Sequence, residues 1–78
     1  MDTFTVYGHC ASGYTELWDV VATKDEAEKL GRQILDEYPV VLQDNGRVDR
    51  DGGGVVWVEI FGPGIEESLG IERTLVRP

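Results

Sequence analysis

The spacing between hydrophobic residues divides this chain into segments with two different repeats. Residues 3 to 10 alternate, with Phe4, Val6 and Cys10 on one side and polar or aromatic groups on the other. A repeat of two indicates a half-buried strand. Residues 14 to 23 form a second alternating segment after a tight connection. We expect the two segments to pair as an antiparallel hairpin.

The second of these segments carries large apolar groups on both of its faces. Trp18, Val20 and Ala22 share one face with Tyr14 and Glu16, opposite a face made of Thr15, Leu17, Asp19 and Val21. A strand of this kind either lies in the centre of a sheet or has a second face that meets another surface. The sequence leaves both interpretations open.

Residues 23 to 39 change to the repeat of a helix. Thr23 and Glu26 have the spacing of a capping box. In this motif the Thr23 hydroxyl accepts from the Glu26 N–H, and the Glu26 carboxylate accepts from the Thr23 N–H. Pro39 ends the helix. One face is expected to be buried because its apolar positions follow the helical spacing. These positions are Ala27, Leu30, Gly31, Ile34, Leu35 and Tyr38.

Residues 40 to 54 permit two arrangements. The segment 40–43 is β-prone, and the Asn45-Gly46 pair that follows is a signal for a type I′ turn. The remainder, 48–54, is rich in Gly and Asp. The segment is therefore either a small hairpin through Asn45-Gly46 or one long mobile connection to the next strand.

The C-terminal third contains one clear strand and a less regular tail. Residues 55 to 61 alternate, with Val56, Val58 and Ile60 on one side and Val55, Trp57, Glu59 and Phe61 on the other. The Gly62-Pro63-Gly64 segment ends this strand. Beyond it, the pattern permits one helical turn at 65–69 and a last strand at 71–76.

Together these segments predict an α+β fold with the order ββα(β)ββ. One helix can cover one face of a three- or four-stranded antiparallel sheet, and 78 residues allow only a single domain, 1–78. The opposite sheet face would be apolar and aromatic, as contact surfaces and homodimer interfaces are, unless the tail folds over it. It would carry Tyr7, His9, Leu17, Trp57 and Phe61.

The net charge limits the classes of partner that this protein could bind, but it says less about the fold. Fifteen Asp and Glu against seven Lys and Arg give a formal net charge of -8. Such a charge repels phosphate backbones and anionic lipids over about 8 Å at physiological salt, which argues against direct binding of nucleic acid or membranes. The same field attracts basic protein surfaces and speeds encounter with them. The competing interpretation is that acidity serves solubility alone.

Cysteine content and hydropathy indicate where the protein works. The single cysteine, Cys10, cannot form an internal disulfide, and the N-terminal residues do not have the pattern of a secretory signal. The apolar runs are far shorter than the ~20 residues that span a bilayer. We expect a cytoplasmic protein, in the host cytoplasm if it is encoded by a phage, and no insertion into membranes.

The residues that could carry chemistry do not form a recognisable catalytic or metal site. His9 and Cys10 would suit a base and a nucleophile, but neighbours on a strand point to opposite faces, and they supply too few ligands for zinc. The segment 49–52 has the alternate carboxylates and glycine of a calcium loop, yet position 12 of such a loop falls on Ile60. Glycines 52–54 precede a strand, whereas phosphate-binding loops lead into a helix. We therefore expect no enzymatic activity, no metal and no cofactor.

The leading hypothesis is an acidic binding protein that inhibits or regulates a basic protein partner, one that handles nucleic acid. Small acidic phage proteins that block host defence or transcription, including anti-CRISPR proteins and DNA mimics, share this size, charge and expected architecture, although no motif here matches those families. Carboxylates would steer association, and aromatic anchors would supply the affinity. The candidate partner-binding residues are Asp25, Glu28, Asp36 and Glu37 on the helix, Asp44, Asp49 and Asp51 in the following loop, and Tyr7 and Trp57 in the strands.

Two other hypotheses use the same elements differently. In the first, the aromatic sheet face closes a homodimer of a structural or assembly protein, and the acidic surface only keeps it soluble. In the second, a pocket between helix and sheet makes the chain a minor enzyme subunit or a small-molecule sensor. The sequence contains no feature that specifies a ligand for such a pocket.

Overall fold

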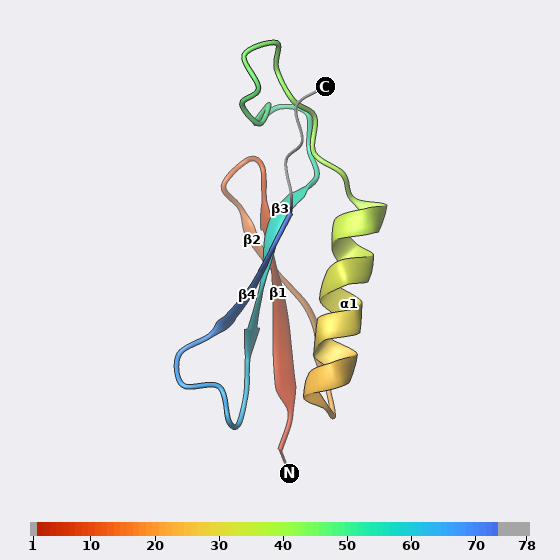
Figure 1. The fold of residues 1–78 in the computed structure, drawn as a ribbon, viewed down its shortest axis with the longest axis vertical. Coiled ribbons are helices and arrows are strands. Elements are labelled where there is room, and N and C mark those ends of the chain that lie inside the picture. The colour runs from red at the N-terminus through yellow and green to blue at the C-terminus, as the bar shows by residue number, and fades with distance from the viewer. Residues whose placement is uncertain (1, 74–78) are drawn as a thin grey trace.

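The computed structural model describes residues 2 to 73 and shows one helix on one face of a four-stranded antiparallel sheet (Figure 1). The strands are β1 (Phe4–Cys10), β2 (Thr15–Val21), β3 (Val55–Phe61) and β4 (Leu69–Glu72), and the helix α1 spans Lys24–Glu37. Their order in the sheet is β2-β1-β3-β4. The predicted fold class is confirmed, in its four-stranded form.

The helix begins and ends where local chemistry predicts. Thr23 is in an extended conformation, and its hydroxyl accepts from the Glu26 N–H at 3.1 Å, so the N-cap half of the predicted capping box is confirmed. The predicted apolar stripe is buried only as far as Leu35. Tyr38 is 45% exposed because it is the C-cap and has already left the helical conformation; its ring instead meets Trp18 edge-on, with centroids 5.0 Å apart.

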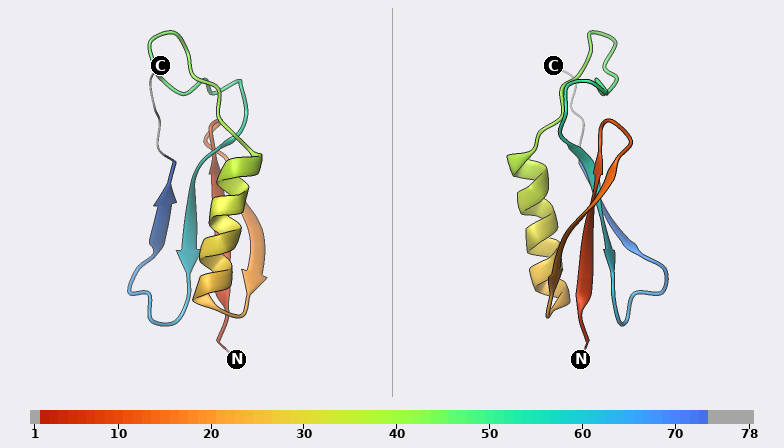
Figure 2. Two further views of the ribbon diagram at one scale, coloured as in Figure 1. Left: turned by 45° about the vertical axis from the view of Figure 1, so that its right-hand side comes forward. Right: turned by 180° about the vertical axis from the view of Figure 1, so that it is seen from behind.

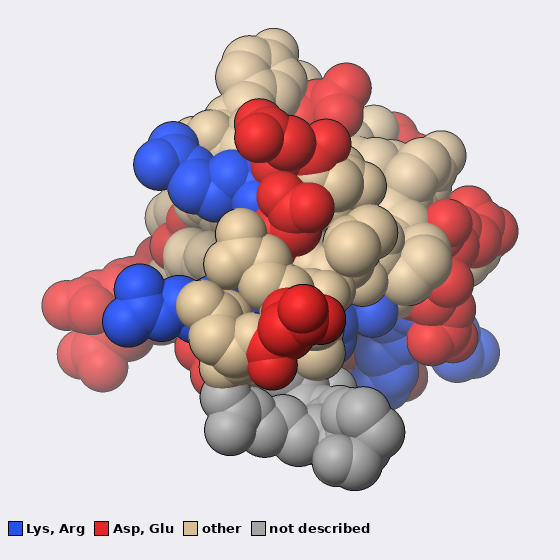
Figure 3. Space-filling view, turned by 90° about the horizontal axis from the view of Figure 1, so that it is seen from above, with Lys and Arg blue, Asp and Glu red and all other residues tan. Residues whose placement is uncertain are grey.

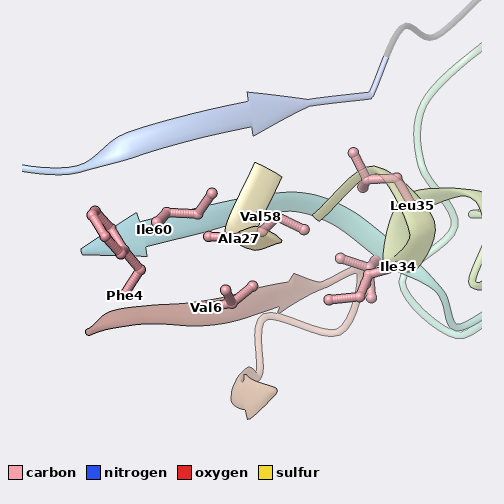
Figure 4. Close-up of a cluster of buried hydrophobic side chains, with 8 residues drawn as sticks. Phe4, Val6, Ala27, Ile34, Leu35, Val58 and Ile60 are labelled. Carbon is pink, nitrogen blue, oxygen red and sulfur yellow. The ribbon is translucent and has the colours of Figure 1, made fainter. Parts of the chain in front are cut away.

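The core lies between α1 and the inner face of the central strands (Figure 4). Among the described residues, no polar or charged side chain is buried. Apolar packing of this kind is the main source of stability for a small domain. The core residues are Phe4, Val6, Ala27, Ile34, Leu35, Val55, Val58 and Ile60.

A bulge in β2 reverses part of the predicted alternation. Tyr7 pairs with Leu17 and Val6 with Asp19, so Trp18 is an extra residue in the ladder. The Trp18 ring lies over Gly8, where it would be 3.1 Å from a Cβ atom, and glycine leaves it room. Beyond the bulge, Val21 packs against the core and Val20 is 48% exposed. The expectation that Val20 shares the face of Trp18 is therefore wrong.

A second bulge changes the face of Val55. His9 pairs with Trp57 and Cys10 with Val55, so Val56 is the extra residue in β3. Val55 is consequently in the core at 2% exposure, although strict alternation places it with Trp57. From Trp57 to Phe61 the predicted alternation is confirmed.

Residues 40 to 54 form a small hairpin, hereafter the 40–54 hairpin. Leu42 and Val48 form an antiparallel bridge, and the Gln43 N–H donates to the Arg47 carbonyl at 2.8 Å. The turn is not type I′, because only Gly46 has a positive φ, of 83°. The loop is instead a turn that ends in one glycine with left-handed backbone geometry. After the two-residue loops, this is the next most common way to connect the strands of a hairpin.

The hairpin ends at a close approach between two chain segments. Gly54 has a φ of 91°, and a Cβ there would collide with the carbonyl group of Pro39. The approach brings the Val55 N–H within 2.9 Å of the Tyr38 carbonyl, which ties the end of α1 to the start of β3. Glycine is required at position 54 because of the positive φ and because a Cβ atom would collide with Pro39.

The connection between β3 and β4, residues 62–68, bends away from the helix (Figure 2). The helical turn expected at 65–69 is wrong, because Leu69 pairs with Ile60 and already belongs to β4. Ile71 continues on the inner face opposite Val58, as the alternation predicts. The expected continuation of this strand to residue 76 lies outside the described residues.

Candidate functional site: the open face of the sheet

The sheet face that points away from α1 is the most unusual surface of this molecule, and we call it the open sheet face. The register places the predicted Tyr7, His9, Leu17, Trp57 and Phe61 on it. Leu17 is 56% and Phe61 39% exposed, which is high for apolar residues of a sheet. Its residues are Thr5, Tyr7, His9, Thr15, Leu17, Val20, Trp57, Glu59, Phe61, Gly70 and Glu72.

A polar cluster built around His9 crosses the middle of this face. The imidazole stacks on the Trp57 indole, with centroids 4.0 Å apart and planes 4° apart. Its Nε2 lies 3.0 Å from Glu59 Oε1, and its Nδ1 lies 3.0 Å from the Thr15 hydroxyl. Because the ring has partners at both nitrogens and on one face, its orientation is fixed.

The Glu59 carboxylate is held in its ionised form. The Ser68 hydroxyl donates to it, and the His9 imidazole adds a second hydrogen bond, so that the pKa of Glu59 lies below its ordinary value despite partial burial. Hydrogen bonds to the charged form of a carboxyl lower its pKa. The open sheet face therefore has a fixed negative charge among its aromatic rings.

A shallow hollow of about 390 Å³ lies beside this charge. Tyr7 and Phe61 form its apolar wall, with ring centroids 5.6 Å apart and planes at 86°. Glu59, Thr5 and Thr15 complete the lining. The hollow thus combines aromatic surface, one carboxylate and two threonine hydroxyl groups, a set of groups that suits a cationic ligand.

In the described chain, basic side chains lie away from the open sheet face, whereas acidic side chains occur on both sides of the sheet. The Lys and Arg residues of the described chain lie on α1, in the 40–54 hairpin and at Arg73, and none lies on the open sheet face. Arg73 is turned inward, where its guanidinium donates to the carbonyls of Leu35, Tyr38 and Val55. Among residues 2 to 73, the Asp, Glu, Lys and Arg side chains of the open sheet face and the adjoining connection are all acidic: Glu59, Glu66, Glu67 and Glu72.

The helix α1, which carries the predicted helix acids, lies on one side of the sheet (Figure 2). The register places Tyr7 and Trp57 on the other side. Asp25, Asp36 and Glu37 are exposed, and Glu28 is half-buried with its Oε1 4.0 Å from Lys24 Nζ. A flat partner surface cannot contact both sides of the sheet at once. The helix acids and the two aromatic candidates therefore belong to different surfaces.

The acids predicted in the loop lie in the 40–54 hairpin, where basic side chains accompany them. Asp44 and Asp51 are exposed, whereas Asp49 Oδ1 accepts the Asp51 N–H at 3.0 Å and so shapes the turn. Arg47 and Arg50 belong to the same hairpin. Acidic and basic groups accordingly lie side by side over this end of the molecule (Figure 3).

Cys10 and His9 point to opposite sides of the sheet, as strand alternation predicts. Cys10 packs against the core, where burial, with a smaller contribution from Glu16, raises the pKa of its thiol. A thiol with a raised pKa is a poor nucleophile. Within residues 2 to 73, no three His, Cys, Asp or Glu side chains converge as a metal site would require.

Comparison of the chain with protein-family models, curated proteins and solved structures found no match. In the part of the chain that the structure describes, no helix is long and apolar enough to cross a membrane. The site is therefore interpreted from its geometry alone.

Several residues of this site were not among the predicted partner-binding residues. The alternation of residues 55 to 61 puts Phe61 and Glu59 on the same face as Trp57, and this pattern is the sequence signal that points to them. Thr15 and Ser68 carried no signal, because their roles depend on which strands become neighbours and on the path of the β3–β4 connection.

Proposed function

We propose that this protein is a non-enzymatic binding protein whose open sheet face engages a basic surface on a partner protein. The observation that supports this most is that exposed apolar side chains share the face with charges of one sign. Aromatic and aliphatic anchors supply affinity in protein interfaces, while surrounding charges steer the encounter and select the partner. A basic surface with a partly apolar centre is the complement of this face.

The class of partner that we propose is a protein that itself handles nucleic acid. Such proteins carry clustered Lys and Arg for phosphate contacts. A chain with net charge -8 would compete with phosphates for those side chains and so inhibit or regulate the partner. This keeps the hypothesis drawn from composition but moves the contact surface from the helix to the sheet.

A homodimer that buries the same face is the second candidate, supported by the exposed Leu17, Val20 and Phe61. Self-association would bring Glu59 and Glu72 of one copy close to the acids of the other. Like charges brought together in an interface are costly unless they are paired. We therefore place a basic partner ahead of a second copy.

Affinity capture from a lysate with matched variants tests the proposal. Leu17→Ser removes an exposed anchor from the open sheet face, and Asp36→Lys alters an exposed acid on the helix. We expect the wild type and Asp36→Lys to retain the same protein, released by a salt gradient, and Leu17→Ser to lose it. Retention by Leu17→Ser with loss by Asp36→Lys would overturn the proposal.

Sedimentation at micromolar concentration separates the two candidates. A monomer that binds a basic protein supports the heterologous interface. A tight wild-type dimer that Leu17→Ser dissociates, with no basic protein captured, would favour the homodimer instead.

A further inference from the structure

We infer that the hollow bounded by Tyr7, Phe61 and Glu59 is a subsite for one arginine side chain of the partner. The inference rests on the proposed function, because it takes the basic partner as given, and it assigns the point at which a cationic side chain enters the open sheet face. Thr5 and Thr15 complete the subsite.

The shape and chemistry of the hollow match a guanidinium group. The Tyr7 and Phe61 rings, 5.6 Å apart and nearly perpendicular, offer both an aromatic face and an aromatic edge. A planar cation stacks on such a face and is attracted by its quadrupole. A purely apolar ligand would strip water from Glu59 without replacing its hydrogen bonds, and an anion would be repelled by it.

Glu59 has acceptor capacity left for this ligand. An ionised carboxylate offers about four lone-pair positions, of which the His9 and Ser68 contacts use two. Those two contacts also fix the direction of the carboxylate, since His9 is itself held by Trp57 and Thr15. A preoriented acceptor binds with less loss of side-chain entropy.

Arginine fits this subsite better than lysine. The guanidinium has five N–H donors in a planar fork, which can reach the Glu59 carboxylate and a threonine hydroxyl while its plane rests on a ring. An ammonium group is a compact, strongly hydrated charge that gains less from the aromatic wall. The two threonine hydroxyls in the lining are acceptors that a fork of donors can use.

The test is an NMR titration of the isotope-labelled full chain with N-acetylarginine amide, with the neutral isostere N-acetylcitrulline amide as the matched control ligand. We expect the arginine probe to shift the signals of Tyr7 and Phe61 and the citrulline probe to bind at least about tenfold more weakly, because the charge-assisted bond to Glu59 is lost. Equal binding of the two probes would overturn the inference.

Variants identify the residues that bind the probe. Glu59→Gln should weaken binding at least about tenfold, whereas Glu72→Gln, which removes an acid of the same face that does not line the hollow, should change it less than about twofold. Unchanged binding by Glu59→Gln would contradict the inference. If Glu59→Gln fails to fold, Phe61→Leu replaces it as the test of the inference. Its affinity for the arginine probe should fall by about three- to fivefold, because the aromatic ring is missing.

The outcomes separate this inference from the proposed function. If Leu17→Ser abolishes capture of a basic protein but the arginine probe does not bind, the subsite is wrong and the proposed function stands. If the probe binds and depends on Glu59, while Leu17→Ser retains the captured protein and Asp36→Lys loses it, the proposed function fails. The hollow would then bind an arginine side chain, but not as the point at which this partner enters the open sheet face.

Discussion

Glu59 lies between Trp57 and Phe61 on β3, and it is the acidic residue among those that line the hollow. Ser68, across the connection to β4, donates to it, and His9 donates from β1. Two segments besides β3 therefore contribute hydrogen bonds to one carboxylate. Such convergence keeps the charge in place when a partner removes water from the face.

Replacing Ser68 with alanine should raise the pKa of Glu59 toward its ordinary value of 4.5, because the largest cause of the lowered pKa is lost. A carboxyl whose pKa is lowered in the folded state stabilises the protein above its unfolded pKa, and this stability is lost as the pH falls through the folded pKa. The free energy of unfolding should therefore fall less between about pH 5 and pH 3 in Ser68→Ala than in the wild type.

The pKa is measured by titrating the carboxyl carbon of Glu59 by NMR. Ser12→Ala is the matched control, because Ser12 is exposed in the β1–β2 turn and should leave that pKa unchanged. An identical Glu59 titration in Ser68→Ala and the wild type would contradict the assigned cause.

Gly54 and Gly53 differ in one respect that a mutation can measure. Both have positive φ values, of 91° and 77°, but a Cβ at Gly54 meets the Pro39 carbonyl whereas one at Gly53 has no neighbour within 4 Å. Gly53→Ala should cost about 1 kcal/mol of unfolding free energy from backbone strain alone. Gly54→Ala should cost more than about 2 kcal/mol, as measured by urea denaturation. Equal costs would show that the close approach does not constrain position 54.

At the scale of elements, β2 has apolar side chains on both faces, as a buried central strand would. It nevertheless lies at an edge of the sheet. Trp18 and Val21 face the helix side, and Leu17 and Val20 remain exposed on the open sheet face. An edge strand that is apolar on both faces is a liability unless a partner covers one of them. The arrangement is the main reason for proposing that this face binds another protein.

The C-terminal end of α1 depends on a residue far away in the sequence. The last turn of the helix contains no basic residue, and Arg73 supplies donors to the carbonyls of Leu35 and Tyr38 and also to that of Val55. One guanidinium thus joins the helix end to β3. Lysine cannot reproduce this fork.

Arg73→Lys should therefore lower the free energy of unfolding by about 1 to 3 kcal/mol, because at least one carbonyl loses its charged donor. Chemical denaturation monitored by tryptophan fluorescence measures the change. Arg32→Lys, at an exposed position of the same helix, should shift it by less than about 0.5 kcal/mol. A similar loss in both variants would argue against a specific role for Arg73.

For the whole molecule, the distribution of charge matters more than its total. In the described chain, the bases lie on the helix side, in the 40–54 hairpin and at Arg73, while the charged side chains of the open sheet face and the connection beside it are all acidic. A cationic partner is therefore steered toward the sheet side. Exposed charges of this kind act chiefly on the association rate.

Two double charge reversals distinguish the sides of the molecule. Glu66→Lys with Glu67→Lys and Asp36→Lys with Glu37→Lys each change the net charge from -8 by +4, to -4. We expect the first pair to slow association with a short arginine-rich peptide more strongly, and to flatten its salt dependence more, in stopped-flow fluorescence. A larger effect of the helix pair would return the contact surface to the helix.

Much of the fold could be predicted because the evidence for it is local. The cap at Thr23, the helical stripe and the alternation of β1 all depend on residues within a few positions of one another. The errors occur where a distant residue intervenes: Trp18 bulges out of β2 over Gly8, and Val56 bulges out of β3. A bulge moves the following side chains of a strand to the opposite face of the sheet, and the local pattern of residues does not predict it.

By itself, then, the sequence determined one helix, the strands, the net charge and the set of aromatic residues on the face opposite the helix. These could be predicted because periodicity and composition are properties of the chain alone. Only the tertiary structure decided that β2 is an edge strand, that the helix acids and the aromatic anchors are on opposite sides, and that Ser68 and His9 meet at Glu59. The physical reason is that these relations depend on strand order and loop path, which are set by packing between segments distant in the chain.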